Sequence, residues 1–321
     1  MDRRGRAVID PQFRRAFQFS EGFAFVRLQD RRWCGYIDEM GRMAIGPTRD
    51  WSYGQPFSEG RAAVWSSKRR PWSGRRINGS LVATGPAQYI DRTGRYITDH
   101  WYEGCFDFSE GIGCAFDSAG AVGIDRSGKV LFHRPLRVHP FSEGLAAALS
   151  NSSGVFVYGY VDRTGRMVIP PRRGQLSVPF REGLALVIDY IRGVSTGYMD
   201  RSGRQVLSTT YRTKDKEAGC FYEGLAVVKD DSGWFHIDHS GRPQYGERWA
   251  KARRFSEGLA AVSVVDSAGS GRWGYIDRAG RVQIFLNFRE AFEFNGGIAQ
   301  VVLDGNSWCY VDRQGDLFGV P

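Results

Sequence analysis

Two short stretches decide the fold of this chain, because both recur from one end of it to the other. One is F-S-E-G-L-A at residues 255–260, and the other is W-G-Y-I-D-R-A-G-R at residues 273–281. Versions of the first stretch begin at Phe19, Phe57, Phe108, Phe141, Phe180, Phe221, Phe255 and, with its glutamate replaced, Phe294. A two-part motif that returns at a regular period indicates a tandem-repeat architecture.

The spacing of the second stretch sets the size of one repeat. Its aspartate stands at Asp38, Asp91, Asp125, Asp162, Asp200, Asp238, Asp277 and Asp312, and a further D-x-x-G occupies residues 2–5. Successive copies lie 34 to 53 residues apart, which is the length of one supersecondary unit. We therefore predict eight units, with a partial unit at the N-terminus, in a single all-β repeat domain that spans residues 1–321.

Each unit is typical of a β-meander of three strands joined as hairpins. Apolar residues alternate with polar or small ones at period two in L-A-x-V, in W-G-Y-I-D and in R-x-V-I. The D-R-x-G-R stretch favours a type I turn closed by a G1 bulge, and the glycine of each F-S-E-G corner is expected at positive φ. No segment keeps a 3.6-residue period, although residues 248–255 and 288–294 could each form one turn of helix.

These two motifs resemble the WG-repeat family of bacterial tandem-repeat proteins, and the resemblance covers essentially the whole chain. The tryptophan of the family's name survives at Trp33, Trp234, Trp273 and Trp308, whereas the eighth unit has lost its glutamate. The resemblance implies an all-β repeat architecture and a binding or scaffolding role. It implies no catalytic residues.

The count of predicted strands favours an open, curved array of repeats. The sequence holds eight first strands, eight second strands and nine third strands. A propeller-like ring usually completes its last blade with a strand from the other terminus, whereas an open array carries capping units at both ends. The closed ring is the alternative. The D-x-x-G at residues 2–5 also suggests a repeat set that extends upstream of Met1, as in an N-terminally truncated fragment.

The most regular carboxylates are expected to be structural. An enzyme needs an acid/base pair once, so acids repeated in every unit are predicted to form turns and accept hydrogen bonds. They are the eight aspartates above and Glu21, Glu59, Glu110, Glu143, Glu182, Glu223 and Glu257. The arginine after each aspartate is expected to be a solvated turn residue or the partner of a neighbouring repeat's acid. An anion-binding row of these arginines is the alternative.

The remaining composition gives no support to metal or cofactor chemistry. The five cysteines, Cys34, Cys105, Cys114, Cys220 and Cys309, form no C-x-x-C and are expected to be small buried thiols. The five histidines lack the spacing of metal ligands, so we predict neither a metal nor a cofactor. No apolar run approaches the roughly 20 residues of a membrane span, and no signal peptide follows Met1, so we expect a cytoplasmic protein.

The longest departure from the repeat is a basic insert at residues 66–87. Its candidate binding residues are Lys68, Arg69, Arg70, Trp72, Arg75 and Arg76. Such a cluster can bind phosphate or an anionic glycan while the indole stacks on a base or sugar. A solvated loop without a ligand is the alternative. Other variable tips at residues 149–157, 188–196 and 264–271 occupy the same slot, so one variable edge is the predicted recognition surface.

The sequence thus predicts a non-enzymatic binding or scaffold protein that recognises a protein or polymeric partner along the variable edge. With a formal net charge of +9, a polyanion or glycan binder that uses the basic insert is the alternative. An enzyme whose site is built from non-repeated residues, such as His100, His133 and His139, is a lesser alternative.

An open array predicts a large radius of gyration. A compact chain of this length would have a value near ~20 Å, and the open array should clearly exceed it in small-angle scattering of the monodisperse protein. A compact value, with a central dip in the distance distribution, would instead indicate the ring.

Overall fold

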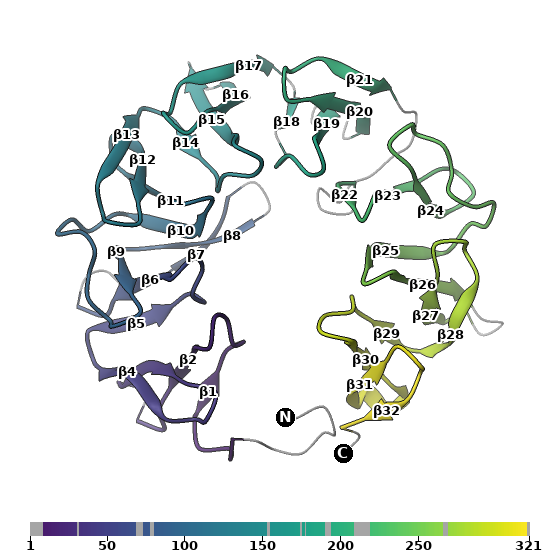
Figure 1. The fold of residues 1–321 in the computed structure, drawn as a ribbon, viewed down its shortest axis with the longest axis horizontal. Helices are drawn as coiled ribbons and strands as arrows, with labels where there is room; N and C mark the ends of the chain where they lie inside the picture. Colours follow the sequence, from purple (N-terminus) through teal and green to yellow (C-terminus); the bar gives the residue numbers. More distant parts are fainter. Residues whose placement is uncertain are drawn as a thin grey trace. The chain divides into compact units, whose positions relative to one another are not determined.

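The chain folds into small antiparallel β-sheets. The computed structural model describes residues 9–30, 32–68, 73–77, 80–152, 155–173, 175–176, 178–189, 194–208, 219–265 and 269–319. Contacts divide the chain into two compact units, one of Val8–Arg173 and a second that includes Gly174–Pro321. Neighbouring strands of a sheet follow one another along the chain, apart from one inserted hairpin (Figure 1). None of the described residues forms a helix that could cross a membrane.

In the described part of the N-terminal unit, four repeat sheets and the hairpin follow one another. The first two sheets are β1 (Arg15–Ala16), β2 (Ala24–Arg27), β3 (Cys34–Ile37), β4 (Met43–Thr48), then β5 (Trp51–Gly54), β6 (Arg61–Ser66), β9 (Ala87–Asp91). The inserted hairpin is β7 (Ser73–Ile77) and β8 (Ser80–Thr84). The next sheets are β10 (Gly104–Ser109), β11 (Ile112–Asp117), β12 (Gly120–Asp125), β13 (Val130–Arg134), then β14 (Arg137–Val138), β15 (Ala146–Ser152), β16 (Val155–Val161), β17 (Met167–Arg173).

The described part of the C-terminal unit holds four more sheets. The first two are β18 (Gln175–Leu176), β19 (Leu184–Asp189), β20 (Val194–Asp200), β21 (Gln205–Ser208), then β22 (Phe221–Tyr222), β23 (Leu225–Lys229), β24 (Trp234–Ile237). The last two are β25 (Lys251–Ser256), β26 (Leu259–Val265), β27 (Gly271–Ile276), β28 (Val282–Phe288), then β29 (Glu290–Ala291), β30 (Ile298–Val302), β31 (Trp308–Asp312), β32 (Leu317–Phe318). A short 3₁₀ turn, η1 (Asp304–Asn306), joins β30 to β31.

The prediction of tandem all-β meander repeats is confirmed, but most sheets have one strand more than predicted. The extra strand precedes each F-S-E-G corner, and β25 and β29 lie where turns of helix were considered, so that interpretation was wrong. The pairing of β25 with β26 shifts register between Ala252 and Phe255. Such a bulge interrupts the period-two pattern, which hid this strand in the sequence. The open array, the ring and the single domain stay predictions.

Each F-S-E-G corner is a two-residue hairpin turn with both central residues at positive φ. Ser20 and Phe23 exchange backbone hydrogen bonds of 2.8 and 3.0 Å around Glu21 and Gly22. Across the repeats the corner glutamates have φ of 51 to 55° and the following glycines 75 to 83°. The predicted positive φ of the corner glycines is confirmed. The left-handed glutamates were not predicted, because a hairpin turn of this kind usually takes Asn-Gly.

Hydrophobic cores lie between successive sheets within each unit. Tyr36 and Ile45 of the first sheet share one core with Val64 of the second. Tyr275 of β27 and Val301 of β30 share another in the C-terminal unit. The five cysteines are buried, as expected. A single sheet therefore buries its apolar faces only against its neighbours.

Backbone conformation alone makes the corner glycine necessary. At Gly22, with φ of +83°, an added Cβ would meet nothing within 4 Å, and the same open space surrounds Gly246, which lacks a positive φ. We expect Gly22→Val to reduce the free energy of unfolding by about 1 kcal/mol or more, since β-branched residues fit this region poorly. Gly246→Val should stay within about 0.5 kcal/mol of the parent. Equal denaturation midpoints for the two variants would contradict this account of the corner.

Candidate binding site at the variable edge

The corner glutamates join each repeat to the next. In the six junctions that the structure describes, the carboxylate accepts a hydrogen bond from the N–H of the next corner's glycine at 2.6 to 3.0 Å. In four of them it also accepts one from the preceding residue's N–H at 2.5 to 2.6 Å. We call this series the corner ladder. Its carboxylates are hydrogen-bond acceptors in every described junction.

Arginines of the D-R-x-G turns support the same junctions. Arg92 Nη2 lies 2.8 Å from the carboxylate of Glu21, and Arg126 Nη2 lies 2.9 Å from that of Glu59. Burial by itself raises the pKa of both carboxyl groups, but the hydrogen bonds from arginine and from backbone N–H groups outweigh it and hold each pKa below its ordinary value. Arg163 donates instead to the backbone oxygen of Glu110 at 2.6 Å. These arginines therefore serve neighbouring repeats, as one of the two interpretations predicts.

Aromatic and hydroxyl groups of the motifs also act across junctions. The ring of Tyr36 packs edge-on against Phe57 of the next corner, with centroids 5.0 Å apart, and its hydroxyl donates to the Gln55 oxygen at 2.7 Å. Ser20 Oγ donates to the Phe57 oxygen at 2.6 Å. His236 replaces this tyrosine in the sixth unit and packs on Phe255 at 4.5 Å. The side chains of these repeated residues therefore make contacts that stabilise the fold.

The D-x-x-G aspartates close turns within their own repeats. Each of the eight described carboxylates accepts hydrogen bonds from the N–H groups two and four residues later, at 2.8 to 3.1 Å. The turn glycines have φ of 74 to 95°. The predicted turn geometry is confirmed, and the N–H bonds lower the pKa of aspartates such as Asp38.

The histidines considered for a metal or an active site occupy separate surroundings. Burial lowers the pKa of His236 to about 4, and its Nε2 lies 2.9 Å from the Arg253 oxygen. His239 stacks on Phe221, and His133 lies 3.1 Å from Asp117. Among the described residues, no three histidine, cysteine or acidic side chains are placed to hold one metal ion.

The variable segments all connect the second strand of a sheet to its third. The insert lies between β6 and β9, and residues 149–157, 188–196 and 264–271 lie at the tips of β15–β16, β19–β20 and β26–β27. Residues 28–33 form the corresponding tip of the first sheet, between β2 and β3. We keep the name variable edge for this end of the sheets.

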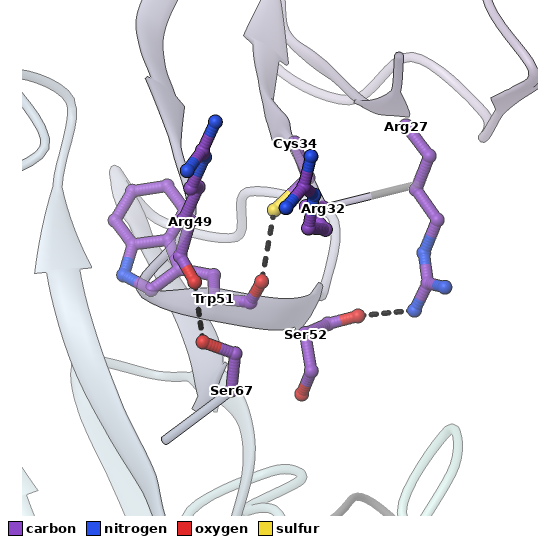
Figure 2. A pocket seen from close by; sticks show the side chains of 7 residues that line it. All are labelled: Arg27, Arg32, Cys34, Arg49, Trp51, Ser52 and Ser67. Atoms are coloured by element: carbon purple, nitrogen blue, oxygen red, sulfur yellow. Dashed lines mark hydrogen bonds between the residues drawn. The ribbon is translucent and has the colours of Figure 1, made fainter. Parts of the chain in front are cut away.

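A cavity of about 390 Å³ opens at the variable edge between the first two sheets of the N-terminal unit. We call it the arginine pocket, and it is lined by Arg27, Arg32, Cys34, Arg49, Trp51, Ser52 and Ser67. Figure 2 shows Arg32 and Arg49 beside the Cys34 thiol and the Trp51 indole, and Arg27 on the other side of the pocket, where it reaches Ser52. Cys34 donates its thiol proton to the Trp51 oxygen at 3.2 Å, and burial raises the pKa of that thiol to about 11. The thiol is therefore neutral and the pocket's charge is cationic.

The three pocket arginines are held differently. Arg27, at the end of β2, donates to the Ser52 oxygen, and Arg32 lies 3.3 Å from Asp30. Arg49 stacks on the Trp33 ring, with its guanidinium carbon 4.3 Å from the centroid. Neither the carbonyl nor the ring neutralises the charge of Arg27 or Arg49. The pocket therefore presents net positive charge beside the apolar surface of Trp51.

The basic insert begins at the rim of this pocket. Ser67 donates its N–H to the Asp50 oxygen at 2.8 Å and its hydroxyl to the Arg49 oxygen. Lys68 Nζ lies 2.5 Å from the Asp50 carboxylate. Of the other candidate residues, Arg75 and Arg76 belong to β7, where they pair with Val82 and Leu81 of β8. Arg69, Arg70 and Trp72 lie outside the described residues.

Comparison with protein families assigns this architecture. A model of the WG containing repeat matches residues 1–33, 89–116, 158–188, 197–234 and 273–306, together just over half of the chain. The chain belongs to the WG-repeat family. No curated protein matches it.

A solved structure also resembles the WG-repeat chain. It is PorZ of Porphyromonas gingivalis, described as an essential bacterial surface component of the type-IX secretion system, with 10% sequence identity and a TM-score of 0.34. The match covers 94% of the present chain and 45% of that chain. The WG-repeat chain thus spans less than half of the length of PorZ.

Three of the four WG tryptophans lie at the variable edge. Trp33 precedes β3, and Trp234 and Trp308 begin β24 and β31, whereas Trp273 lies inside β27 and is buried in the core. Trp234 lies 5.9 Å below the Lys229 ammonium, much as Trp33 lies below Arg49. Two of the repeats thus bring an indole ring and a cation together at the edge where the sequence varies.

Sequence reasoning missed the pocket arginines. Arg27, Arg32 and Arg49 are isolated in the sequence, and none belongs to either repeated motif. The available signal was the D-R-R-W tip at residues 30–33, in which basic residues adjoin the WG tryptophan. Their convergence depends on the packing of the first sheet against the second.

The lowered pKa values of Glu21 and Glu59 predict that the stability of the fold is sensitive to acid. A carboxyl group whose folded pKa lies below its unfolded pKa stabilises the fold above the unfolded value, and that stability is lost as pH falls through the folded pKa. The melting temperature should therefore fall between about pH 5 and pH 3, and Glu59→Gln should lower it at pH 7 and flatten this dependence. Glu103→Gln, at an exposed position of the same unit, serves as the control. A Glu59→Gln profile parallel to the parent's would contradict the role of the carboxylate.

Proposed function

We propose that this WG-repeat chain is a non-enzymatic binding or scaffold protein that recognises an anionic protein or polymeric partner at the variable edge. One observation carries the proposal: the guanidinium groups of Arg27, Arg32 and Arg49 line one pocket at that edge. Arginine is suited to bidentate recognition of carboxylate, sulfate and phosphate groups. A volume of about 390 Å³ is large enough for such a group with its apolar neighbour.

The charge around the pocket supports an anionic partner. Four described cations, those of the pocket arginines and of Lys68, stand against the two carboxylates of Asp30 and Asp50. The surplus of two positive charges faces solvent, where it steers an incoming anion. The basic insert starts at this rim and adds Arg69, Arg70, Arg75 and Arg76 in sequence. The pocket and the insert thus form adjoining parts of one proposed surface.

The use of the motif residues supports a binding role over a catalytic one. The repeated carboxylates accept hydrogen bonds from turn N–H groups, and the aspartates close turns. Residues with these duties are poorly placed to exchange protons with a substrate. The positions that vary between repeats are therefore the ones available for recognition.

Two exposed arginines provide a matched test. Arg32 lines the pocket and pairs with Asp30, whereas Arg42 pairs with Asp38 in a D-x-x-G turn, and both side chains are 73% exposed. We expect Arg32→Gln combined with Arg49→Gln to weaken binding to heparin or to a polyglutamate peptide by at least about tenfold, which is ~1.4 kcal/mol. Arg42→Gln should bind like the parent.

The contribution of the insert is measured separately. Neutralising Lys68, Arg69, Arg70, Arg75 and Arg76 should reduce the slope of affinity against salt by roughly one for each phosphate or sulfate group that the variant no longer binds. The melting temperature should change little, because surface substitutions contribute little to stability. If neither the pocket variant nor the five-fold variant alters retention on these probes, the proposed surface is wrong.

A further inference from the structure

Each of the six described junctions of the corner ladder is built from two halves. The carboxylate half is the glutamate of one corner. The receiving half belongs to the next repeat and consists of its corner N–H pair together with the side chain that follows its D-x-x-G aspartate. Glu21 shows the complete arrangement, because its carboxylate accepts hydrogen bonds from Glu59 N at 2.6 Å, Gly60 N at 2.8 Å and Arg92 Nη2 at 2.8 Å.

Both halves are regular in the second to seventh repeats, and one half is altered in the first repeat and the other in the eighth. The corner residue is glutamate in seven repeats and Gly296 in the eighth. The side chain after the aspartate is Glu39 in the first full repeat, and in the following repeats it is Arg92, Arg126, Arg163, Arg201, His239, Arg278 or Arg313. In the partial unit at residues 2–5 it is Arg3. The first full repeat thus lacks the basic side chain of a receiving half, and the eighth repeat lacks the carboxylate half.

The first corner retains the backbone of a receiving half but not its charge. Glu21 and Gly22 have φ of 51° and 83°, within the range of the other corners. Among the described residues, no carboxylate accepts a hydrogen bond from either N–H group. A glutamate that docked there would meet the exposed Glu39 where an arginine stands at other junctions. At the junction of Glu21, Arg92 lies 2.8 Å from the carboxylate. A second carboxylate in the corresponding place would repel the first, so Glu39 opposes that docking.

The corner of the eighth repeat binds the carboxylate of the preceding corner but has no carboxylate of its own. Gly296 and Gly297 donate N–H hydrogen bonds to Glu257 at 2.6 and 2.9 Å. The φ of Gly296 is 64°, close to the 51 to 55° of the corner glutamates, but glycine has no carboxylate. The backbone of the turn is therefore kept while the carboxylate half of a further junction is absent.

We propose that Glu39 and Gly296 interrupt the corner ladder, so that the first corner rejects the corner glutamate of another WG repeat and the eighth corner offers none. Identical chains with complementary surfaces associate head to tail into rings or filaments. This role is independent of the arginine pocket and of its partner.

Restoring both halves tests the proposal. Gly296→Glu can be accommodated, because the other corners hold glutamate at φ of 51 to 55° and an added Cβ at Gly296 would meet nothing within 4 Å. In the full chain, Glu39→Arg combined with Gly296→Glu should create two complementary halves. Contact between molecules would raise the mass measured by light scattering with increasing concentration. Contact within one molecule would raise the melting temperature above that of the matched Glu39→Arg and Gly296→Gln variant. Either change should weaken in high salt, since exposed ion pairs are screened.

Matched variants separate the ladder from non-specific effects. Glu39→Arg alone should retain the mass and melting temperature of the parent. Gly296→Glu alone, and Glu39→Arg combined with Gly296→Gln, should retain the mass but melt at a lower temperature, because a side chain at the positive φ of residue 296 is strained. Circular dichroism establishes that every variant is folded. The proposal is overturned if the charged double variant matches the Gln-containing control in both mass and melting temperature.

Discussion

The structure depends on a carboxylate that reaches from a left-handed turn into the turn of the next repeat. Glutamate at positive φ is unfavourable, at a cost on the order of 1 kcal/mol or more per corner. Each corner tolerates it because the carboxylate satisfies one or two N–H groups that point away from their own hairpin. The unfavourable backbone conformation of the glutamate in one repeat is thus offset by hydrogen bonds to the next repeat.

The same dependence extends to the other motif residues. A motif tyrosine covers the next corner's phenylalanine, the corner serine bonds that residue's oxygen, and arginines return to the preceding corner. The cores lie between sheets rather than within them. A WG repeat is therefore not an independent folding unit, because it is stabilised by contacts with the repeats on either side. Repeat arrays generally behave in this way.

This division of labour explains where recognition can occur. Residues that maintain junctions recur in nearly every repeat, so they cannot distinguish one part of the surface from another. The tips of the sheets lie outside the corner ladder, and they vary in length and charge. At the first two tips, the pocket arginines, Trp33 and the start of the insert meet, and this combination of cations with aromatic rings gives the first two sheets a surface of their own. Arginine stacked on an indole remains charged while its orientation is restrained.

The sequence by itself determined the repeat period, the all-β class, the D-x-x-G turns and the positive φ of the corner glycines. These properties follow from local geometry: strand pleat gives period two, and only certain residues accept turn dihedrals. The first strand of each sheet was missed because it is short or carries a bulge, as β25 does between Ala252 and Phe255. Local pattern also gave no reason for glutamate at a left-handed position.

Only the tertiary structure decided which residues meet across junctions and which form a site. Glu21 and Gly60 are separated by 39 residues, and their hydrogen bond requires two sheets to pack in register. Arg27, Arg32 and Arg49 come from a strand end, a tip and an inter-sheet connection, and they converge for the same reason. The periodicity of a sequence indicates the secondary structure and the buried face of one segment, whereas these contacts depend on the packing of one sheet against another.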